Sequence, residues 1–212
     1  MGQVLLVRHG QASWGAADYD VLSPLGERQA TATGAYLADV RPDAVVHGLM
    51  RRQRRTTELM AEAAGWTVPA LVDGRWDEMD HLAVLDAQAR DEPQGFEGEP
   101  DARQFQAWFE RATARWLSGA HDGEYAESWP VFRDRVLGGL ADLGDGTAVV
   151  VTSGGPISIV VAHLLDSPAA YQRIAPVVVN ASVTKVVVGR RGRTLVSFNE
   201  HGHLAGDLLT YR

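Results

Sequence analysis

One stretch near the start of the chain decides the fold: Val4-Leu5-Leu6-Val7-Arg8-His9-Gly10. Its first four residues form an apolar run, which is typical of a strand buried on both faces of a sheet. Polar residues follow at once. Because ligands bind beyond the carboxyl ends of strands in open α/β sheets, the stretch predicts a central strand with a site at its end.

The rest of the chain alternates between strand and helix patterns. Strands are expected at residues 4–7, 44–47, 68–72, 148–151, 183–188 and 194–198. Helices are expected at residues 24–40, 50–64, 103–117 and 129–143, and a further helix follows Gly154-Gly155-Pro156 and runs to Leu165. Ser23-Pro24 fits a helix start, with serine as the N-cap and proline in the first turn. The sequence 189–192 reads as a hairpin turn between the last two strands.

This alternation predicts an α/β fold. We expect a single-domain three-layer α/β/α sandwich over residues 1–212, with a mostly parallel sheet and an antiparallel edge strand. On the first helix, the expected inward side chains are Leu25, Ala32, Tyr36 and Leu37. Residues 73–101 read as mostly irregular, and the region 73–128 is a candidate cap that sets specificity.

Composition narrows the class of protein. The 212 residues carry a net charge of −7, which argues against a general nucleic-acid binder. The absence of cysteine excludes disulfides, zinc–thiolate sites and cysteine nucleophiles. No signal peptide and no apolar run of about 18 residues is present, so a cytoplasmic protein without membrane contact is expected. No metal or cofactor is predicted, and a homodimer is left open.

Arg8-His9-Gly10 carries the first chemical signal. A neutral imidazole can act as a nucleophile and accept a phosphoryl group. The adjacent Arg8 can neutralise charge on the phosphoryl oxygens, and Gly10 would allow close backbone approach. A solvent-exposed loop start is the structural alternative.

Two further clusters suggest anion binding. Arginines 51, 52, 54 and 55 open a predicted helix after the second strand, although several of them must be solvated. Arg54 and Glu58 have the spacing of a helical ion pair, which is the structural alternative. Thr152-Ser153-Gly154-Gly155-Pro156 links a buried strand to a helix start, where backbone N–H groups can cradle a phosphate. The structural alternative for this segment is a tight strand-to-helix turn capped by Ser153.

Phosphate transfer also needs a proton donor for the leaving oxygen and then a base for water. Acidic side chains cluster at Asp73, at residues 77–80 and at residues 97–101. One carboxyl group from residues 77–80 could act first as the proton donor and then as the base. Composition alone does not show which of the three acidic clusters supplies it.

Together and in this order, these clusters resemble the histidine phosphatase superfamily, also called the phosphoglycerate mutase-like family. The similar segments are residues 5–13, residues 22–30, the Arg52-Gln53-Arg54-Arg55-Thr56 block and Trp76-Asp77-Glu78. The resemblance runs from residue 5 to about residue 160. It implies the same three-layer fold, with no cofactor or metal.

The resemblance also implies roles for individual residues. His9 would be the phospho-accepting nucleophile, and Glu78 the proton donor and later the general base. Arg8 and Arg52 would bind the phosphoryl oxygens. The pocket edge would be shaped by Gly10, Gln11 and Ser13, and the cradle would include Ser153 and Gly154.

One position departs from the family pattern. The family usually has a second histidine in Ser/Thr-His-Gly-Gly, and Ser153 occupies that position here. A hydroxyl can bond a phosphoryl oxygen but carries no charge, and losing one such group costs on the order of 100-fold in rate. His81 could compensate as an accessory residue.

The expected function is a histidine acid-type phosphatase acting on a small phosphorylated metabolite. Dedicated phosphoglycerate mutases of the family are generally longer, which favours hydrolysis. A phosphoglycerate mutase-type phosphotransferase stays open, as does a phosphate-binding pseudoenzyme marked by Ser153.

Overall fold

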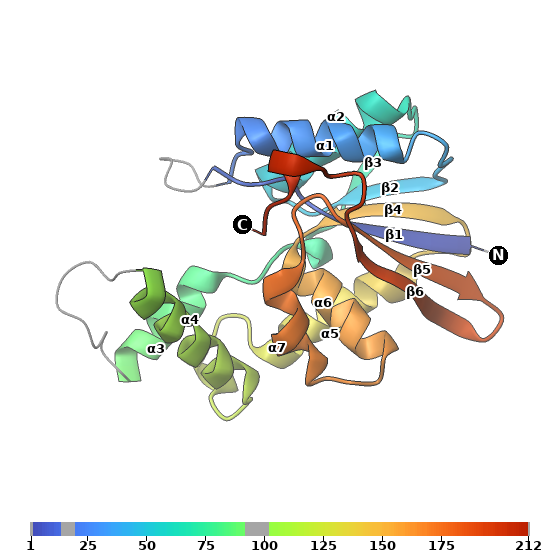
Figure 1. The fold of residues 1–212 in the computed structure, drawn as a ribbon. Helices are drawn as coiled ribbons and strands as arrows, with labels where there is room; N and C mark the ends of the chain where they lie inside the picture. The colour runs from blue at the N-terminus through green and yellow to red at the C-terminus, as the bar shows by residue number, and fades with distance from the viewer. Residues whose placement is uncertain (1, 14–19, 92–101, 212) are drawn as a thin grey trace. The chain divides into compact units, whose positions relative to one another are not determined.

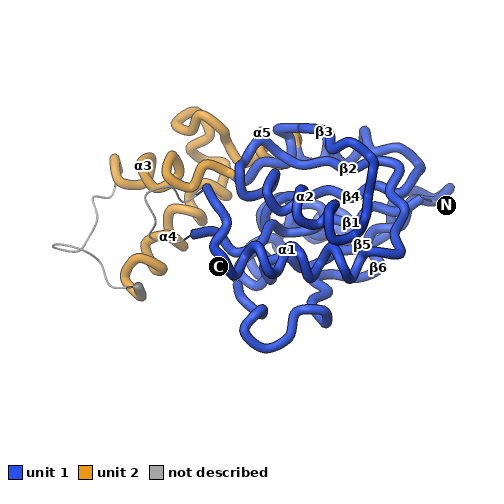
Figure 2. The backbone as a smooth tube through the Cα atoms, turned by 90° about the horizontal axis from the view of Figure 1, so that it is seen from above, with its two compact units in different colours: residues 1–78, 136–212 blue, residues 79–135 orange. Residues whose placement is uncertain are grey.

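The computed structural model describes residues 2–13, 20–91 and 102–211. The chain forms two compact units, drawn in two colours in Figure 2. The first comprises residues 1–78 and 136–212, and the second comprises residues 79–135. The second unit falls almost wholly within the stretch 73–128 that the sequence marks as a candidate cap, a role that stays a prediction.

A six-stranded sheet forms the centre of the first unit. Its strands are β1 (Gly2–Arg8), β2 (Ala44–His47), β3 (Ala70–Val72), β4 (Thr147–Thr152), β5 (Val183–Gly189) and β6 (Gly192–Glu200). The spatial order is β3-β2-β4-β1-β5-β6. The first four strands are parallel, and β5 is antiparallel to both of its neighbours, β1 and β6. The mixed sheet predicted from the sequence is therefore confirmed.

Helices cover both faces of this sheet (Figure 1). One layer contains α1 (Pro24–Tyr36) and α2 (Arg51–Ala64), and the other contains α6 (Gly154–Leu164), α7 (Ala170–Ile174) and the end of α5 (Trp129–Asp142). Between the first layer and the sheet lies a buried cluster: Leu5, Val7, Ala30, Leu37, Met60, Val149, Val151 and Val183. Alternate residues of β1 and β4 thus fill the core on this side, as the sequence of each strand predicts.

The packing of α1 against α2 differs from the expectation for the first helix. Tyr36 is 50% exposed, so its predicted inward position was wrong, whereas Leu37 is buried. The buried residues of α1 are small or polar: Gly26, Gln29, Ala30, Thr33 and Gly34. The cause is the closeness of the two helices, because a Cβ placed on Gly34 would lie 2.5 Å from the Met60 carbonyl oxygen.

The second unit is helical and contains α3 (His81–Asp91), α4 (Ala102–Leu117) and the start of α5. The Trp116 ring is 1% exposed, with Trp129 at 5.3 Å and Phe132 at 5.5 Å between ring centroids. Its indole nitrogen donates to the Glu127 carbonyl at 2.9 Å. This aromatic cluster gives the unit a small core of its own.

Helix α3 corrects the prediction that residues 73–101 are mostly irregular. The pattern was missed because alanine and polar residues dominate the helix, so it shows little apolar periodicity. The acidic residues 97–101 and part of the expected loop 11–22 fall outside the described residues.

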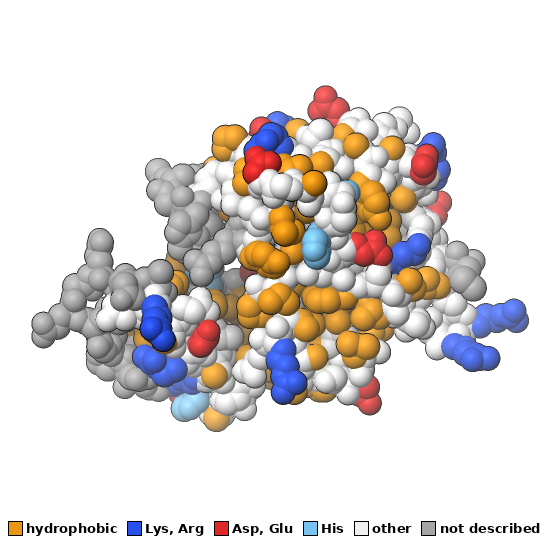
Figure 3. Space-filling model, in the orientation of Figure 1, with side chains coloured by type: hydrophobic (Ala, Val, Ile, Leu, Met, Phe, Trp, Pro, Cys, Tyr) orange, Lys and Arg blue, Asp and Glu red, His pale blue; other side chains and the backbone are white. Residues whose placement is uncertain are grey.

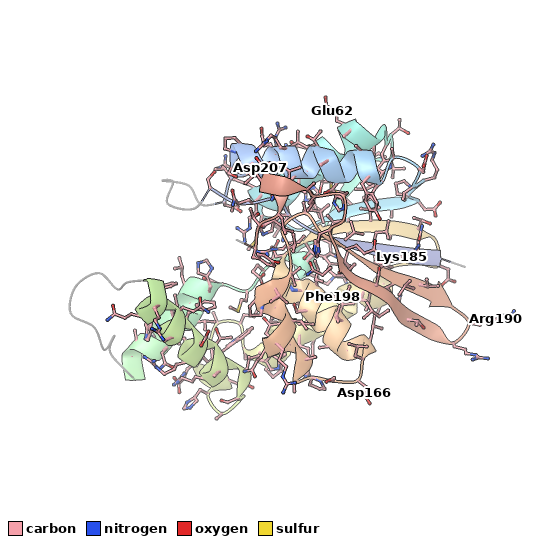
Figure 4. The ribbon with its side chains drawn as sticks, viewed as in Figure 1. Glu62, Asp166, Lys185, Arg190, Phe198 and Asp207 are labelled. Atoms are coloured by element: carbon pink, nitrogen blue, oxygen red, sulfur yellow. The ribbon has the colours of Figure 1, made fainter. Side chains whose placement is uncertain are left out.

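The last hairpin behaves as predicted. Gly189 pairs with Gly192, which has a φ of 102° that only glycine adopts readily. Figure 4 labels Arg190 at the tip of this hairpin, where its side chain points away from the sheet. No described helix is long and apolar enough to cross a bilayer.

The contact between α1 and α2 gives a stability test. Gly34→Ala should lower the free energy of unfolding by about 1–3 kcal/mol, because the new methyl group meets the backbone of Met60. Gly138→Ala is the matched control on α5, since its Cβ would meet nothing nearer than 4.0 Å. Urea unfolding of both variants measures the difference, and equal stability would contradict the close contact.

Candidate active site

The candidate site lies at the carboxyl edge of the sheet, where β1 and β4 end side by side with Arg8 opposite Thr152. Beyond this pair, the His9 backbone is held by the end of β4 and by the segment that precedes β5. Its N–H donates to the Thr152 carbonyl at 2.8 Å, and its own carbonyl accepts from the Ala181 N–H at 3.2 Å. The central position of β1 therefore fixes the backbone that carries the imidazole.

The His9 ring is 5% exposed and contacted at both nitrogens. Nδ1 lies 2.7 Å from the Gly10 carbonyl oxygen, and Nε2 lies 3.1 Å from Nε of Arg52. A carbonyl accepts only, and a guanidinium donates only. These partners assign the proton to Nδ1 and leave the lone pair on Nε2.

The surroundings also keep this ring neutral. Burial lowers the pKa of His9 well below its ordinary value, and the positive charges of Arg52 and then Arg8 lower it further. The hydrogen bond to Gly10 works in the opposite direction but does not reverse the shift. Two guanidiniums near one imidazole thus favour a neutral, nucleophilic nitrogen.

Arg52 is fixed at the start of α2. It is 6% exposed, and its Nη1 forms an ion pair with Asp20 at 2.8 Å. The other oxygen of Asp20 accepts from the Arg51 N–H, also at 2.8 Å. Arg51, Arg54 and Arg55 are exposed, and Arg54 pairs with Glu58 at 2.9 Å, as the sequence predicts.

Arg8 is held by two backbone carbonyl groups from distant parts of the chain. Its Nη1 donates to the carbonyl oxygens of Val178 and Tyr211, the latter at 3.0 Å. The two residues come from the loop before β5 and from the last described residue of the chain. Distant segments thus place this guanidinium beside the ring of His9.

Gly10 is required by packing with the first turn of α1. A Cβ at Gly10 would lie 2.3 Å from the Gly26 carbonyl oxygen. Its N–H donates to Thr56 on α2 at 3.1 Å. Gln11 is half-buried and accepts from the Ser23 hydroxyl at 2.8 Å, while the Ser13 N–H donates to the Val21 carbonyl. This network joins the loop after His9 to both helices.

Ser153 lies at the start of α6 but does not cap it with its side chain. Its hydroxyl oxygen accepts from Nε2 of Gln53 at 3.0 Å, and the same amide donates to the Trp76 carbonyl at 3.1 Å. Ser153 is 1% exposed and Gln53 is fully buried. The Ser153 hydroxyl can therefore still donate its own proton to another group. The neighbouring Gly154 is also buried.

Glu78 reaches the same helix start. Its Oε2 accepts from the Gly155 N–H at 2.9 Å, so the carboxyl group lies at the N-terminal end of α6. Burial and then the charge of Glu78 raise the pKa of the Tyr171 hydroxyl, which is nearly buried on α7. Tyr171 therefore stays a neutral phenol near this carboxyl group.

His81 is the first residue of α3 and belongs to the second unit. Its accessory role stays a prediction.

Several residues of the site carry no signal in the sequence. Asp20 lies in an unpatterned loop, and Gln53 looks like one more polar residue of an exposed helix. Asn180 also contacts His9, with its side-chain amide 3.4 Å from the His9 carbonyl. Only the three-dimensional meeting of these segments reveals them, although a helical-face analysis of α2 would have placed Gln53 one turn before the buried Thr57.

A model of the histidine phosphatase superfamily (branch 1) matches residues 4–201, and the chain belongs to this superfamily. Its members include phosphatases and phosphoglycerate mutases.

Two relatives illustrate both activities. The uncharacterized phosphatase PhoE of Bacillus subtilis is 26% identical over 97% of this chain and 98% of its own length. A 2,3-bisphosphoglycerate-dependent phosphoglycerate mutase of Corynebacterium efficiens is 32% identical over 61% of this chain. That match spans about half of the mutase, 54% of its length.

The fold is shared with solved structures. Bacillus stearothermophilus YhfR matches with a TM-score of 0.71 at 20% identity, covering 96% of this chain and 99% of its own. At this identity the likeness shows the fold.

The charge environment of His9 gives a spectroscopic test. At pH 6, below the ordinary histidine pKa of about 6.5, the ring of His9 should still be neutral with its proton on Nδ1. Nitrogen chemical shifts of the imidazole report both properties. Arg52→Gln should raise the His9 pKa because it removes the guanidinium that lowers this pKa more than Arg8 does, whereas Arg54→Gln on the exposed face should not. A fully protonated ring at pH 6 is the contrary result.

Proposed function

We propose that the protein is a phosphomonoesterase that hydrolyses a small phosphorylated metabolite through a phosphohistidine on His9. The observation that carries the proposal is the neutral imidazole with its Nε2 lone pair beside Arg52. Family membership supports phosphate chemistry in general, and the contacts of these residues support the particular roles.

In the first step, Nε2 of His9 attacks phosphorus. The N–P bond forms from the nitrogen lone pair, and the P–O bond breaks with its electron pair moving to the leaving oxygen. Glu78 in its acid form gives that oxygen a proton. Arg52 must first turn its Nε–H bond from His9 to a phosphoryl oxygen, which frees the attacking lone pair. Arg8 and Arg52 then balance charge spread over the phosphoryl oxygens.

In the second step, water attacks the phosphohistidine. The Glu78 carboxylate takes a proton from this water as its oxygen bonds to phosphorus. The N–P bond breaks, and its electron pair returns to Nε2 of His9. Inorganic phosphate leaves, and Glu78 is again protonated for the next cycle.

Ser153 takes a supporting role in this mechanism. Gln53 donates to its oxygen, which orients the free O–H for a phosphoryl oxygen. Such a hydrogen bond replaces the donor function of an imidazolium without its charge. Gly154, at the first position of α6, adds a backbone N–H to the same cradle.

A small anionic substrate suits the surface better than a nucleic acid. On the face drawn in Figure 3, lysine and arginine side chains are scattered rather than gathered into a basic surface. The buried Arg52 and the half-buried Arg8 supply local positive charge in a chain whose net charge is −7. The cytoplasmic setting remains an expectation from the sequence.

His9→Ala tests the central step. Turnover of p-nitrophenyl phosphate should fall by roughly a thousandfold or more, because the nucleophile is lost. Wild-type enzyme denatured at alkaline pH during turnover should carry one acid-labile phosphoryl group, detected by intact mass, and the variant none. Unchanged turnover in His9→Ala would refute the mechanism. Phosphate binding without turnover in the wild type would favour the pseudoenzyme, and transfer to phosphoglycerate would favour the mutase.

Ser153→Ala tests the substituted position. We expect kcat to fall by about 10²-fold, the loss typical of one donor to a transition-state oxygen. Stability should change little, because Gln53 keeps its bond to the Trp76 carbonyl. Steady-state kinetics and urea unfolding separate the two effects. Ser158→Ala on the same helix is the control, since its hydroxyl donates to the Gly154 carbonyl within the helix. Full activity in Ser153→Ala would remove the serine from the mechanism.

A further inference from the structure

The second glycine of the Gly154-Gly155 pair has no explanation in backbone conformation. Gly155 is the second residue of α6, and its φ is not positive. Glycine at a helical position costs stability relative to alanine. Some other requirement must therefore keep a side chain away from this position.

Glu78 occupies the space that a side chain at Gly155 would need. A Cβ at Gly155 would lie 2.1 Å from Oε1 of Glu78 and 3.2 Å from Oε2. The Gly155 N–H meanwhile donates to Oε2 at 2.9 Å. One residue thus supplies both the hydrogen bond and the empty volume that hold this carboxyl group.

The carboxyl group is favoured at this place by its surroundings. The first amides of a helix have no partner within the helix, and negative charge is stabilised near them. The preceding residues of Glu78 are also fixed, because the Trp76 carbonyl accepts from Thr152 at 2.5 Å and from Gln53. The Glu78 carboxyl group is therefore held through the fixed backbone near Trp76 and through the hydrogen bond to its Oε2.

We propose that Gly155 is a positioning residue that seats Glu78 for proton transfer. Its N–H holds Oε2, and its missing side chain leaves room for Oε1 to carry the proton to the leaving oxygen. The inference rests on the proposed function, in which Glu78 protonates that oxygen as the P–O electron pair moves onto it. It adds the reason why only glycine fits at this position.

Gly155→Ala is the direct test. The atom that the new methyl group meets is the end of a flexible side chain, so Glu78 should move aside while the fold survives. The readout is kcat/KM, measured for an alkyl phosphate and for p-nitrophenyl phosphate. An alkoxide must be protonated as it leaves, whereas p-nitrophenolate is stable without a proton.

We expect Gly155→Ala to lower kcat/KM about 100-fold for the alkyl phosphate and less than about 5-fold for the aryl phosphate, as for loss of a general acid. Glu78→Gln should give the same selective pattern. Gly138→Ala, the matched change in α5, should affect neither substrate. A purely structural defect at Gly155 would lower kcat/KM equally for both substrates. That result, or no loss of kcat/KM at all, would overturn the inference.

Two comparisons separate this inference from the proposed function. If Glu78→Gln shows no preference between leaving groups, the role of Glu78 as proton donor fails. Urea unfolding tests whether Gly155 holds the Glu78 carboxyl group, without any measurement of turnover. Glu78→Ala should lower the unfolding midpoint of the wild type but not of Gly155→Ala, where the carboxyl group is already displaced. Equal decreases in both backgrounds would show that Gly155 does not hold Glu78.

Discussion

The site depends on one electrostatic constraint: a buried imidazole that must stay uncharged between two guanidiniums. His9 meets it through a carbonyl acceptor at Nδ1 and a guanidinium donor at Nε2. A charged ring would face Arg8 and Arg52 in a place with little water to screen the repulsion. The same positive charges that keep the ring neutral are those that an incoming phosphate would neutralise. In the proposed mechanism, one arrangement therefore serves both substrate binding and nucleophile activation.

The polar groups around this centre are arranged in a connected set. Gln53 bridges Ser153 and the Trp76 carbonyl, and Thr152 bonds the same carbonyl. Two residues later, Glu78 bonds the start of α6. The loop after β3 is thus tied to the loop after β4 at successive points. A connected buried network of this kind fixes side-chain positions more firmly than isolated contacts do.

Much of the fold could be predicted from the sequence, because apolar runs followed by Gly, Pro or Ser carry strand, turn and cap signals. β2 spans Ala44–His47, as the sequence predicts, and Ser23 caps α1 through the Gly26 N–H. Helix α3 was missed because its composition lacks periodicity. The motif residues His9, Arg52 and Glu78 could be named in advance. Asp20 and Gln53 could not, because their importance arises from contacts 32 and 100 residues away in sequence.

The hold on Arg8 has a consequence for folding. The bond between its guanidinium and the Tyr211 carbonyl joins residues 203 positions apart. The central sheet is no more local, because β1 pairs with β4 and with β5, where Gly2 lies opposite Val188. The entropy of closing a loop grows only slowly with its length, so the sheet and this bond carry similar costs. The sheet and the contact that holds this arginine are therefore expected to form together, as one cooperative unit.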